Sequence, residues 1–273
     1  MLSHRSYLPY QAPGISPVVA LRPIITPRQN QLLAALPDGE YARLLPHLMP
    51  VPLPQGWQLH AAGDRERHLY FITAGIVSRF YVLENGSQAG FSVVGSEGAV
   101  GIGGFLGGEG APSQASALCA GYAYRLGLDT LQRVLPSVPS LPPLLLRYTQ
   151  ALMTQTTQTV VCNRYHSVEQ QLSRFILSCL DRLASNDLAM TQEQLANVLG
   201  VRREGITDAA GRLQSARAIR YARGHISVAD RAVLAKHACE CYGVVKQEYE
   251  RLLPGPDDEG QVVHSAWNRA FQR

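Results

Sequence analysis

The stretch from Met190 to Val228 most constrains how this chain can fold, because it carries consecutive start and stop signals for two helices and a hairpin. Thr191 is suited to cap a first helix, with Gln194 three residues later as in a capping box. The apolar positions that follow have helical spacing, at Leu195, Val198 and Leu199. Gly200 then supplies the residue type that ends a helix in a left-handed conformation. The pattern predicts a short helix and a tight turn.

A second helix is predicted to begin near Arg202. Its inward face carries four apolar residues, Ile206, Ala209, Ala210 and Leu213. The outward face of its N-terminal half carries five polar ones, Arg202, Arg203, Glu204, Thr207 and Asp208. A helix-turn-helix that reads DNA has this design, since its second helix enters the major groove and its N-terminal residues meet the base edges. Residues 219–228 then alternate apolar and polar side chains around Arg223-Gly224, as expected of a hairpin wing.

An ordinary helical hairpin with a solvated arginine face is the alternative to DNA binding. Residues 201–225 contain six arginines, no lysine and two acidic residues. Arginine is the side chain suited to bidentate contact with guanine and to contact with phosphate, so this composition favours DNA. We expect base contacts from Arg202, Arg203, Glu204 and Thr207. We expect phosphate contacts from Thr191, Arg212, Arg223 and His225.

The composition is that of a globular chain long enough for two domains. The chain has 273 residues, of which 46% are hydrophobic and 17% charged, and it can bury a sizeable core. Its net charge of +4 permits nucleic acid as a partner without requiring it. No apolar run reaches the about 18 residues of a membrane-spanning helix, and the N-terminus lacks the pattern of a signal peptide. We expect a cytoplasmic protein without a membrane partner.

The five cysteines are odd in number and unevenly spaced, at Cys119, Cys162, Cys179, Cys239 and Cys241. They form no C-x₂-C pair and therefore predict neither a zinc nor a redox framework. Cys239 and Cys241 form a C-x-C on a predicted helix, where residues two apart face different ways. Buried or reduced thiols are expected, as is usual in the cytosol, and no metal site is predicted.

The region upstream of the helix-turn-helix is predicted to be rich in antiparallel strands. Residues 1–28 are proline-rich and predict a flexible extension, and residues 29–141 predict a sensor domain that begins with two short helices around Pro37–Gly39. Strands are clearest at Leu69–Ile72, Gly75–Leu83 and Ala89–Val94, with a hairpin turn at Glu84–Ser87. Short strands with such turns indicate an antiparallel barrel or roll.

The segment from Gly95 to Gly110 is rich in glycine and contains eight glycines. Such a density lets backbone N–H groups converge on an anion. The other interpretation is a loop that only turns at a corner of the barrel. Both interpretations stay open on the sequence alone.

A long helix is predicted over residues 142–166, opened by Pro142 and Pro143. One apolar stripe would dock this helix on the roll, and a threonine-rich face is free to meet a ligand or a partner subunit. A dimer is attractive because helix-turn-helix proteins usually bind two half-sites. Residues 167–253 are expected to form the DNA-binding domain with a C-terminal helix, and residues 254–273 a tail.

This order of elements resembles the cyclic-AMP receptor / fumarate-nitrate regulator (Crp/Fnr) family of bacterial transcription factors, from about Gln29 to Leu253. The most specific parts are Tyr70–Ser78, Val94–Gly98 and Thr191–Val228. The resemblance implies an α+β fold, with an N-terminal antiparallel β-roll (a cyclic-nucleotide-binding-like jelly roll), a long central helix and a C-terminal winged helix-turn-helix. It also implies transcription regulation, a homodimer formed through the long helix, double-stranded DNA and RNA polymerase as partners, and an effector pocket between roll and helix.

The resemblance sharpens the expected DNA contacts. Arg203-Glu204 occupies the place where the family's reading helix often has an Arg-Glu pair, which by chemistry would contact guanine O6/N7 and a cytosine N4 amine. Asp208 occupies the place of a second base-reading arginine in the cyclic-AMP receptor. The DNA site is therefore expected to differ from that receptor's at the matching position.

The effector pocket is where this chain departs from the cyclic-AMP receptor. The corresponding positions are Gly101, Ile102, Gly103, Gly104, Ser113 and Gln114, followed by Ala115. Members that bind cyclic AMP have a Gly-Glu pair for the ribose and an Arg-Ser/Thr-Ala for the phosphate, and both charged contacts are missing here. A buried phosphate without a cationic partner loses a charge-assisted bond and keeps its desolvation cost. We expect cyclic AMP to bind weakly or not at all, which leaves an unidentified small-molecule effector possible.

Other cofactors and other functions are less well supported. No cysteine precedes Cys119, which argues against the iron–sulfur sensors of the family, and lone histidines at His60 and His68 do not indicate haem. A metal-dependent, cupin-like enzyme on the β-roll would need clustered histidines. A regulatory subunit without DNA would keep the roll but leave the arginine-rich helix unexplained. The leading hypothesis is a DNA-binding regulator and not an enzyme.

Overall fold

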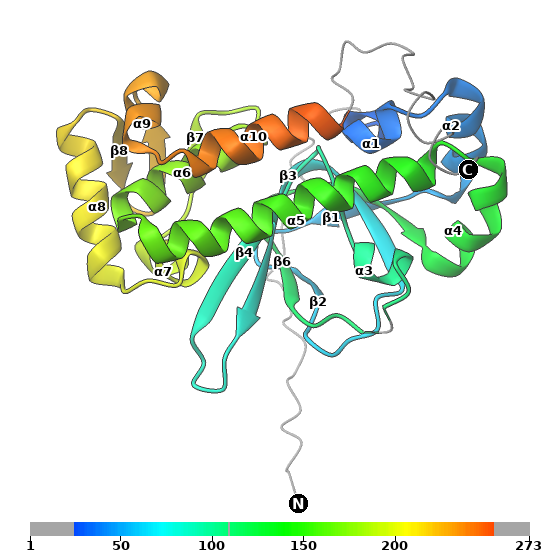
Figure 1. The fold of residues 1–273 in the computed structure, drawn as a ribbon, viewed down its shortest axis with the longest axis horizontal. Helices are drawn as coiled ribbons and strands as arrows, with labels where there is room; N and C mark the ends of the chain where they lie inside the picture. The colour runs from blue at the N-terminus through cyan, green and yellow to red at the C-terminus, as the bar shows by residue number, and fades with distance from the viewer. Residues whose placement is uncertain (1–24, 109, 254–273) are drawn as a thin grey trace, which may run out of the picture.

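The computed structural model describes residues 25–108 and 110–253 (Figure 1). Most of the predicted extension (1–28) and the whole predicted tail (254–273) therefore lie outside the described residues. The described chain consists of a β-roll, a long helix across it, and a helical C-terminal module with a small sheet of its own. The predicted α+β class is confirmed.

Six antiparallel strands form the roll: β1 (Met49–Leu53), β2 (Gln58–His60), β3 (His68–Val82), β4 (Gln88–Val94), β5 (Ala99–Val100) and β6 (Gln114–Gly127). The main order is β1-β6-β3-β4, with β2 paired to β6 and β5 paired to β3. The predicted hairpin turn joins β3 to β4. Its Gly86 has a φ of +82°, and the Leu83 N–H donates to the Ser87 carbonyl at 2.8 Å.

Strand β3 differs from its prediction, because the sequence indicates two strands that the structure joins into one. The join lies at Gly75, which has a φ of +81°. A Cβ there would lie 2.7 Å from the carbonyl oxygens of both Cys119 and Ala120. The register between β3 and β6 also shifts at this point. Gly75 therefore marks an irregularity where two strands approach closely, and not a strand end.

Short helices precede the roll: η1 (Pro27–Gln29), α1 (Gln31–Ala34), α2 (Asp38–Leu44) and η2 (Leu45–His47). The predicted pair of helices around Pro37 is confirmed. Three of their leucines, Leu32, Leu33 and Leu44, are fully buried in the core of the roll. The Asn30 amide donates to the carbonyl oxygens of Ile72 and Gly98, each at 2.8 Å. These bonds tie the N-terminal helices to β3 and to the turn before β5.

The glycine-rich segment contains one turn of helix, α3 (Ile102–Phe105), which neither interpretation of its sequence predicts. Its first two glycines, Gly95 and Gly98, allow side chains from other parts of the chain to approach the backbone. A Cβ on Gly98 would lie 2.3 Å from Cε2 of the buried Tyr148 ring, and one on Gly95 would lie 2.7 Å from the Cβ of Arg182. At these two positions glycine is needed for close packing.

A short helix α4 (Leu128–Val134) and η3 (Leu135–Ser137) lead from β6 into the long helix α5 (Leu141–Tyr165). Helix α5 crosses the roll in Figure 1. Its docking stripe is buried as predicted, at Leu145, Tyr148, Leu152 and Thr159. The Tyr148 hydroxyl donates to the Ala99 carbonyl at 2.9 Å, so the central helix is attached to β5 as well as packed on the core.

The C-terminal module contains α6 (Val168–Leu180), β7 (Asp187–Ala189), α7 (Gln192–Leu199), α8 (Arg203–Ser215), β8 (Ile219–Ala222), β9 (His225–Val228), α9 (Arg231–His237) and α10 (Cys241–Leu252). Helices α7 and α8 are the predicted helix-turn-helix, and β8 with β9 is the predicted wing. Strand β7, which the sequence does not predict, pairs with β9 and extends the wing to three strands. A second apolar core lies mainly within this module.

The module is packed against the rest of the chain at two places. Helix α10 lies along α5 in Figure 1, and Leu253 just beyond it is buried in the core of the roll. Helix α7 packs on β4, where a Cβ on Gly90 would lie 2.7 Å from the Val198 carbonyl oxygen. The predicted DNA-binding domain is therefore docked on the sensor roll.

The predicted buried, reduced thiols are confirmed, since all five cysteines are free and four of them are buried, but the position of Cys239 differs from its prediction. Cys239 precedes the first residue of α10 and is not helical, so helical spacing does not apply to the C-x-C pair. Cys162, Cys239 and Cys241 are buried together in one cluster, whereas Cys179 lies in the core of the DNA-binding module and Cys119 packs against it.

Candidate nucleic-acid interface

The turn between α7 and α8 is built as its sequence predicts. Thr191 caps α7, and both bonds of the capping box with Gln194 are present. Gly200 ends the helix with a φ of +66°. Arg202 is the N-cap of α8, so the recognition helix begins at Arg203. The first turn of α8 is thus held at a defined distance and angle from α7.

The predicted base-reading residues share one solvent-exposed surface at the N-terminal end of α8. Arg202, Arg203, Glu204 and Thr207 are all exposed, while the opposite face of the helix is buried. The Thr207 hydroxyl lies 3.0 Å from Gln192 Oε1 in α7 and 3.2 Å from the carbonyl oxygen of Arg203, and both oxygens accept hydrogen bonds. Thr207 therefore braces the two helices as well as facing outward. Arg203 places an exposed positive charge on the side of α8 that would face the major groove of DNA.

Arg212 is already engaged by an acidic partner. Its Nε donates to a carboxylate oxygen of Glu169 at the start of α6, and the other oxygen of Glu169 lies 2.7 Å from Nδ1 of His237. Burial raises the pKa of Glu169, but the hydrogen bonds from Arg212 and His237 outweigh it and leave the pKa below its usual value. Glu169 is therefore a charged competitor for any phosphate that approaches Arg212.

The wing places the remaining predicted phosphate contacts near the N-terminus of α7. Arg223 and Gly224 form a two-residue turn with φ of 50° and 78°, the signs that a type I′ hairpin requires. A Cβ on Gly224 would lie 3.4 Å from Cγ2 of Thr191, so the wing tip and the cap of α7 are neighbours. Arg223 and His225 are exposed. The structure thus groups Thr191, Arg223 and His225, whereas Arg212 stands apart with Glu169.

The predicted effector residues differ in burial and in their contacts. Ile102 is buried in the core of the roll, and its place in an effector pocket stays a prediction. The Gly104 N–H donates to Glu66 Oε2 at 2.8 Å, and a Cβ on Gly103 would lie 2.7 Å from the same oxygen. Ser113 is fully buried, and its hydroxyl has no hydrogen-bond partner within the described part of the chain. An internal carboxylate occupies the backbone donor that an anionic ligand would use.

A cavity of about 290 Å³ lies beside this carboxylate, lined by Leu59, His60, Asp64, Arg65, Glu66, Arg67, His68 and Tyr70. Burial lowers the pKa of His60, although the Glu66 carboxylate 3.5 Å away acts to raise it. Neither His60 nor Glu66 was among the predicted pocket residues. The sequence feature that points to this cavity is the run of four charged residues at positions 64–67, which alternates acidic residues and arginines.

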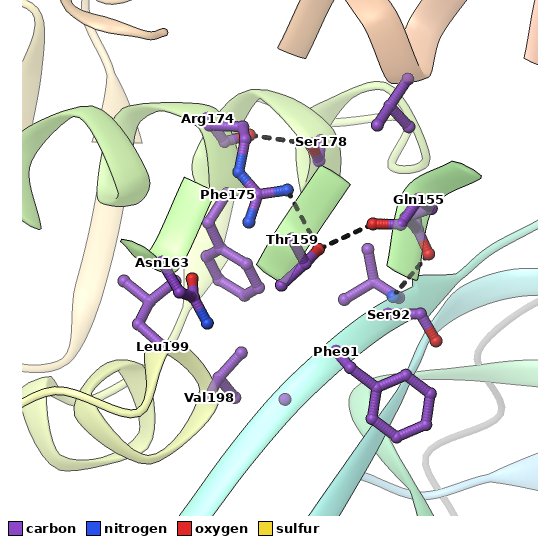
Figure 2. A pocket seen from close by; sticks show the side chains of 13 residues that line it. Phe91, Ser92, Gln155, Thr159, Asn163, Arg174, Phe175, Ser178, Val198 and Leu199 are labelled. Carbon is purple, nitrogen blue, oxygen red and sulfur yellow. Dashed lines mark hydrogen bonds between the residues drawn. The ribbon is translucent and has the colours of Figure 1, made fainter. Parts of the chain in front are cut away.

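A second, smaller cavity of about 30 Å³ lies between the roll, α5, α6 and α7 (Figure 2). Its polar wall is a chain of hydrogen bonds. The Val93 N–H donates to Gln155, and Arg174 reaches the Thr159 hydroxyl at 3.5 Å. The space is about large enough for water and far below the roughly 300–1,000 Å³ of ligand pockets. At this junction the space does not reach the volume of a ligand pocket, and the effector pocket between roll and long helix stays a prediction.

Comparison with known proteins finds one domain type in the roll and another in the C-terminal module. A cyclic nucleotide-binding domain matches residues 50–137, and a Crp-like helix-turn-helix domain matches residues 170–237. The fumarate and nitrate reduction regulatory proteins of Yersinia pestis and Escherichia coli (strain K12) are each 25% identical over 198 residues, which is 68% of this chain and 77% of theirs.

Solved structures agree on the fold. FixK2 from Bradyrhizobium japonicum matches with a TM-score of 0.61 at 14% identity, over 70% of this chain and 98% of its own. The regulator CLP of Xanthomonas campestris matches with a TM-score of 0.59 at 17% identity, over 71% of this chain and 100% of its own. In the part of the chain that the structure describes, no helix is both long and apolar enough to cross a membrane.

Proposed function

This chain belongs to the Crp/Fnr family of transcriptional regulators, and we propose that it binds specific DNA sites as a homodimer without responding to cyclic AMP. The observation that carries the proposal is the exposed Arg203-Glu204 pair on the first turn of α8, beside the wing. We further propose that the protein regulates transcription in the cytoplasm with RNA polymerase as a partner, and that it is not an enzyme.

Arg203 and Glu204 are proposed to read bases, and the more peripheral residues to contact phosphate. A guanidinium matches the O6 and N7 acceptors of guanine, and a carboxylate accepts from the cytosine amine. The wing residues Arg223 and His225 and the α7 cap Thr191 flank the same surface, where they suit the DNA backbone. Arg202 and Thr207 complete the reading face, and a phosphate would compete with Glu169 for the guanidinium of Arg212.

The test compares the Arg203→Ala variant with Arg133→Ala, which removes an exposed arginine from the roll. Sites are first selected from a random DNA pool, and affinity is then measured on the selected site and on random DNA. Arg203→Ala should lose about 1–3 kcal/mol on the selected site and less on random DNA, whereas Arg133→Ala should change neither. Equal losses on both DNAs would place Arg203 on phosphate, and failure to select any site would refute sequence-specific binding.

The homodimer is supported by an exposed apolar stripe on α5. Leu146, Met153 and Val160 are spaced seven residues apart and are 41%, 58% and 66% exposed. A seven-residue apolar repeat is the pattern of a helix that packs against a second helix. Two copies joined along α5 would present two α8 helices to successive half-sites.

Sedimentation velocity on the Met153→Glu variant tests the dimer. A buried pair of carboxylates at the centre of the stripe should yield monomers, because unpaired buried charges are strongly unfavourable. The control is Leu106→Glu, which changes an equally exposed apolar residue on the roll. A wild-type monomer, or a Met153→Glu dimer of unchanged affinity, would contradict the interface.

The absence of a cyclic AMP response is supported by Glu66 as well as by the two missing charged contacts. Its carboxylate is held by the Gly104 N–H, where it would repel a cyclic phosphate. Titration calorimetry with cyclic AMP should show no binding to the wild-type protein. Micromolar binding would contradict this part of the proposal and leave DNA recognition unaffected.

A further inference from the structure

Four potential metal ligands meet at the junction of the central helix and the DNA-binding module. They are Cys162, His166, Cys239 and Cys241, and their ligand atoms all lie within 4.8 Å of one another. Neither the proposed DNA surface nor the roll uses these side chains. The cluster is separate from the cavity beside His60.

Two segments far apart in the chain supply the cluster. Cys162 and His166 are four residues apart at the end of α5, so they lie on one face of the helix. Cys239 lies in the turn that follows α9, and Cys241 is the first residue of α10. The change from turn to helix between them lets both sulfur atoms face the end of α5. The contact between α5 and α10 then closes the site.

Two of the distances between ligand atoms are close to the edges of a tetrahedron around one zinc ion. With Zn–S of about 2.3 Å and Zn–N of about 2.0–2.1 Å, two sulfurs should be about 3.8 Å apart, and a sulfur and a nitrogen about 3.6 Å apart. Cys162 Sγ lies 3.6 Å from Cys239 Sγ, and Cys241 Sγ lies 3.4 Å from His166 Nδ1. A disulfide would need the sulfurs at about 2.05 Å.

The surroundings suit ligands held in their metal-binding forms. The Gln158 amide donates to Cys241 Sγ at 3.1 Å, which stabilises negative charge on that sulfur. The Glu240 carboxylate lies 3.3 Å from His166 Nε2. A proton held on Nε2 by this carboxylate leaves the Nδ1 lone pair directed at the cluster, the arrangement found behind many zinc-bound histidines.

We propose that Cys162, His166, Cys239 and Cys241 bind a single structural zinc ion. Four protein ligands leave no open coordination position, which distinguishes a structural site from a catalytic one. Thiolate and imidazole ligands also select zinc over magnesium and calcium. An iron–sulfur cluster distributes its ligands over several iron atoms, whereas these four ligand atoms all lie within 4.8 Å of one another.

The ion would stabilise the hinge between the sensor roll and the DNA-binding module, which is the junction of α5 and α6. His166 caps the end of α5, and Ser167 directly after it caps α6. Cys239 and Cys241 join the hinge to the connection between α9 and α10. Zinc would fix the direction in which the chain leaves the central helix, and so the orientation of the DNA-binding module.

The experiment measures metal on the full chain and does not depend on DNA binding. The protein is purified under reductant without chelator, and zinc is measured by mass spectrometry of the elements. Apo-protein is then titrated with CoCl₂ and ZnCl₂, following thiolate-to-cobalt absorption. Wild type should hold about one zinc per chain and show a tetrahedral cobalt spectrum that zinc displaces.

Two ligand variants and one neighbouring variant test the assignment. Cys241→Ser and His166→Gln should lose at least tenfold in zinc affinity, and Glu240→Gln, an exposed residue that need not disturb folding, should lose about 10–100-fold through the histidine. Cys119→Ser and Cys179→Ala remove cysteines outside the cluster and should keep the metal. Reduced wild type that binds neither metal, retention of zinc in both ligand variants, or a Cys162–Cys239 disulfide in protein that takes up no metal after reduction would overturn the proposal.

Discussion

The ion pair between Glu97 and Arg182 links the sensor roll to the DNA-binding module, and breaking it should destabilise the protein strongly. Arg182 follows α6, and its Nε donates to Glu97 Oε1 at 2.7 Å. The side chains are only 11% and 9% exposed. The guanidinium also lies over the Tyr249 ring of α10 and donates to the Ser178 carbonyl.

The structure sets the size of the expected effect. Glu97→Gln keeps the shape of the side chain and removes its charge, which leaves the buried guanidinium without a counter-ion. Two unit charges about 4 Å apart attract by about 4 kcal/mol at an effective dielectric constant of about 20. Removing one partner of a buried pair costs about 3–5 kcal/mol. Because Arg182 keeps two other contacts, we expect a loss of about 3 kcal/mol.

Urea unfolding at equilibrium, analysed as a double-mutant cycle with Arg182→Met, measures this effect. Glu97→Gln and Arg182→Met should each lower the free energy of unfolding. The double variant should lose less than the sum, because no buried charge is left unpaired. Glu250→Gln, which breaks an exposed pair with Lys246, serves as the control and should change nothing measurable. Strict additivity, or a Glu97→Gln loss no larger than the control, would refute the reasoning.

Three further perturbations follow from individual contacts. Gly98→Ala places a methyl group against the buried ring of Tyr148 and should lower the free energy of unfolding by about 1–3 kcal/mol. Gly243→Ala, which adds a methyl group in open space on α10, should raise it by about 0.5–1 kcal/mol. Equal effects of the two substitutions would show that contact with Tyr148 is not the cause. Glu169→Gln frees Arg212 and should steepen the salt dependence of DNA binding by about 0.9 per subunit; an unchanged slope would show that Arg212 stays off the DNA. Because the pKa of His60 is lowered in the folded protein, the unfolded chain takes up a proton at a higher pH, and the free energy of unfolding falls as the pH drops below about 6.5. The urea midpoint of His60→Gln should fall less over that range than the midpoint of the wild type. Identical pH profiles of the two midpoints would contradict this.

The helix-turn-helix could be predicted almost completely, because its signals are local. Thr191, Gly200 and the apolar spacing of α7 and α8 each act within a few residues, and the structure contains all of them. The same holds for the docking stripe of α5. The segment Val94–Gly98 is distinctive in the sequence, but the sequence does not reveal that Glu97 pairs with Arg182 or that Gly98 makes room for Tyr148.

The amino-acid sequence by itself determined the order of elements, their apolar faces and the arginine-rich surface of α8, since helix caps, turns and periodic burial depend on neighbouring residues. Only the tertiary structure decided which distant side chains meet. It placed Glu66 on the backbone of Gly104, and Glu169 on Arg212. It also brought Cys162 and His166 to the C-x-C pair more than 70 residues later. Such sites depend on how the helices and strands pack against each other after folding. The spacing of residues along the chain does not predict that packing.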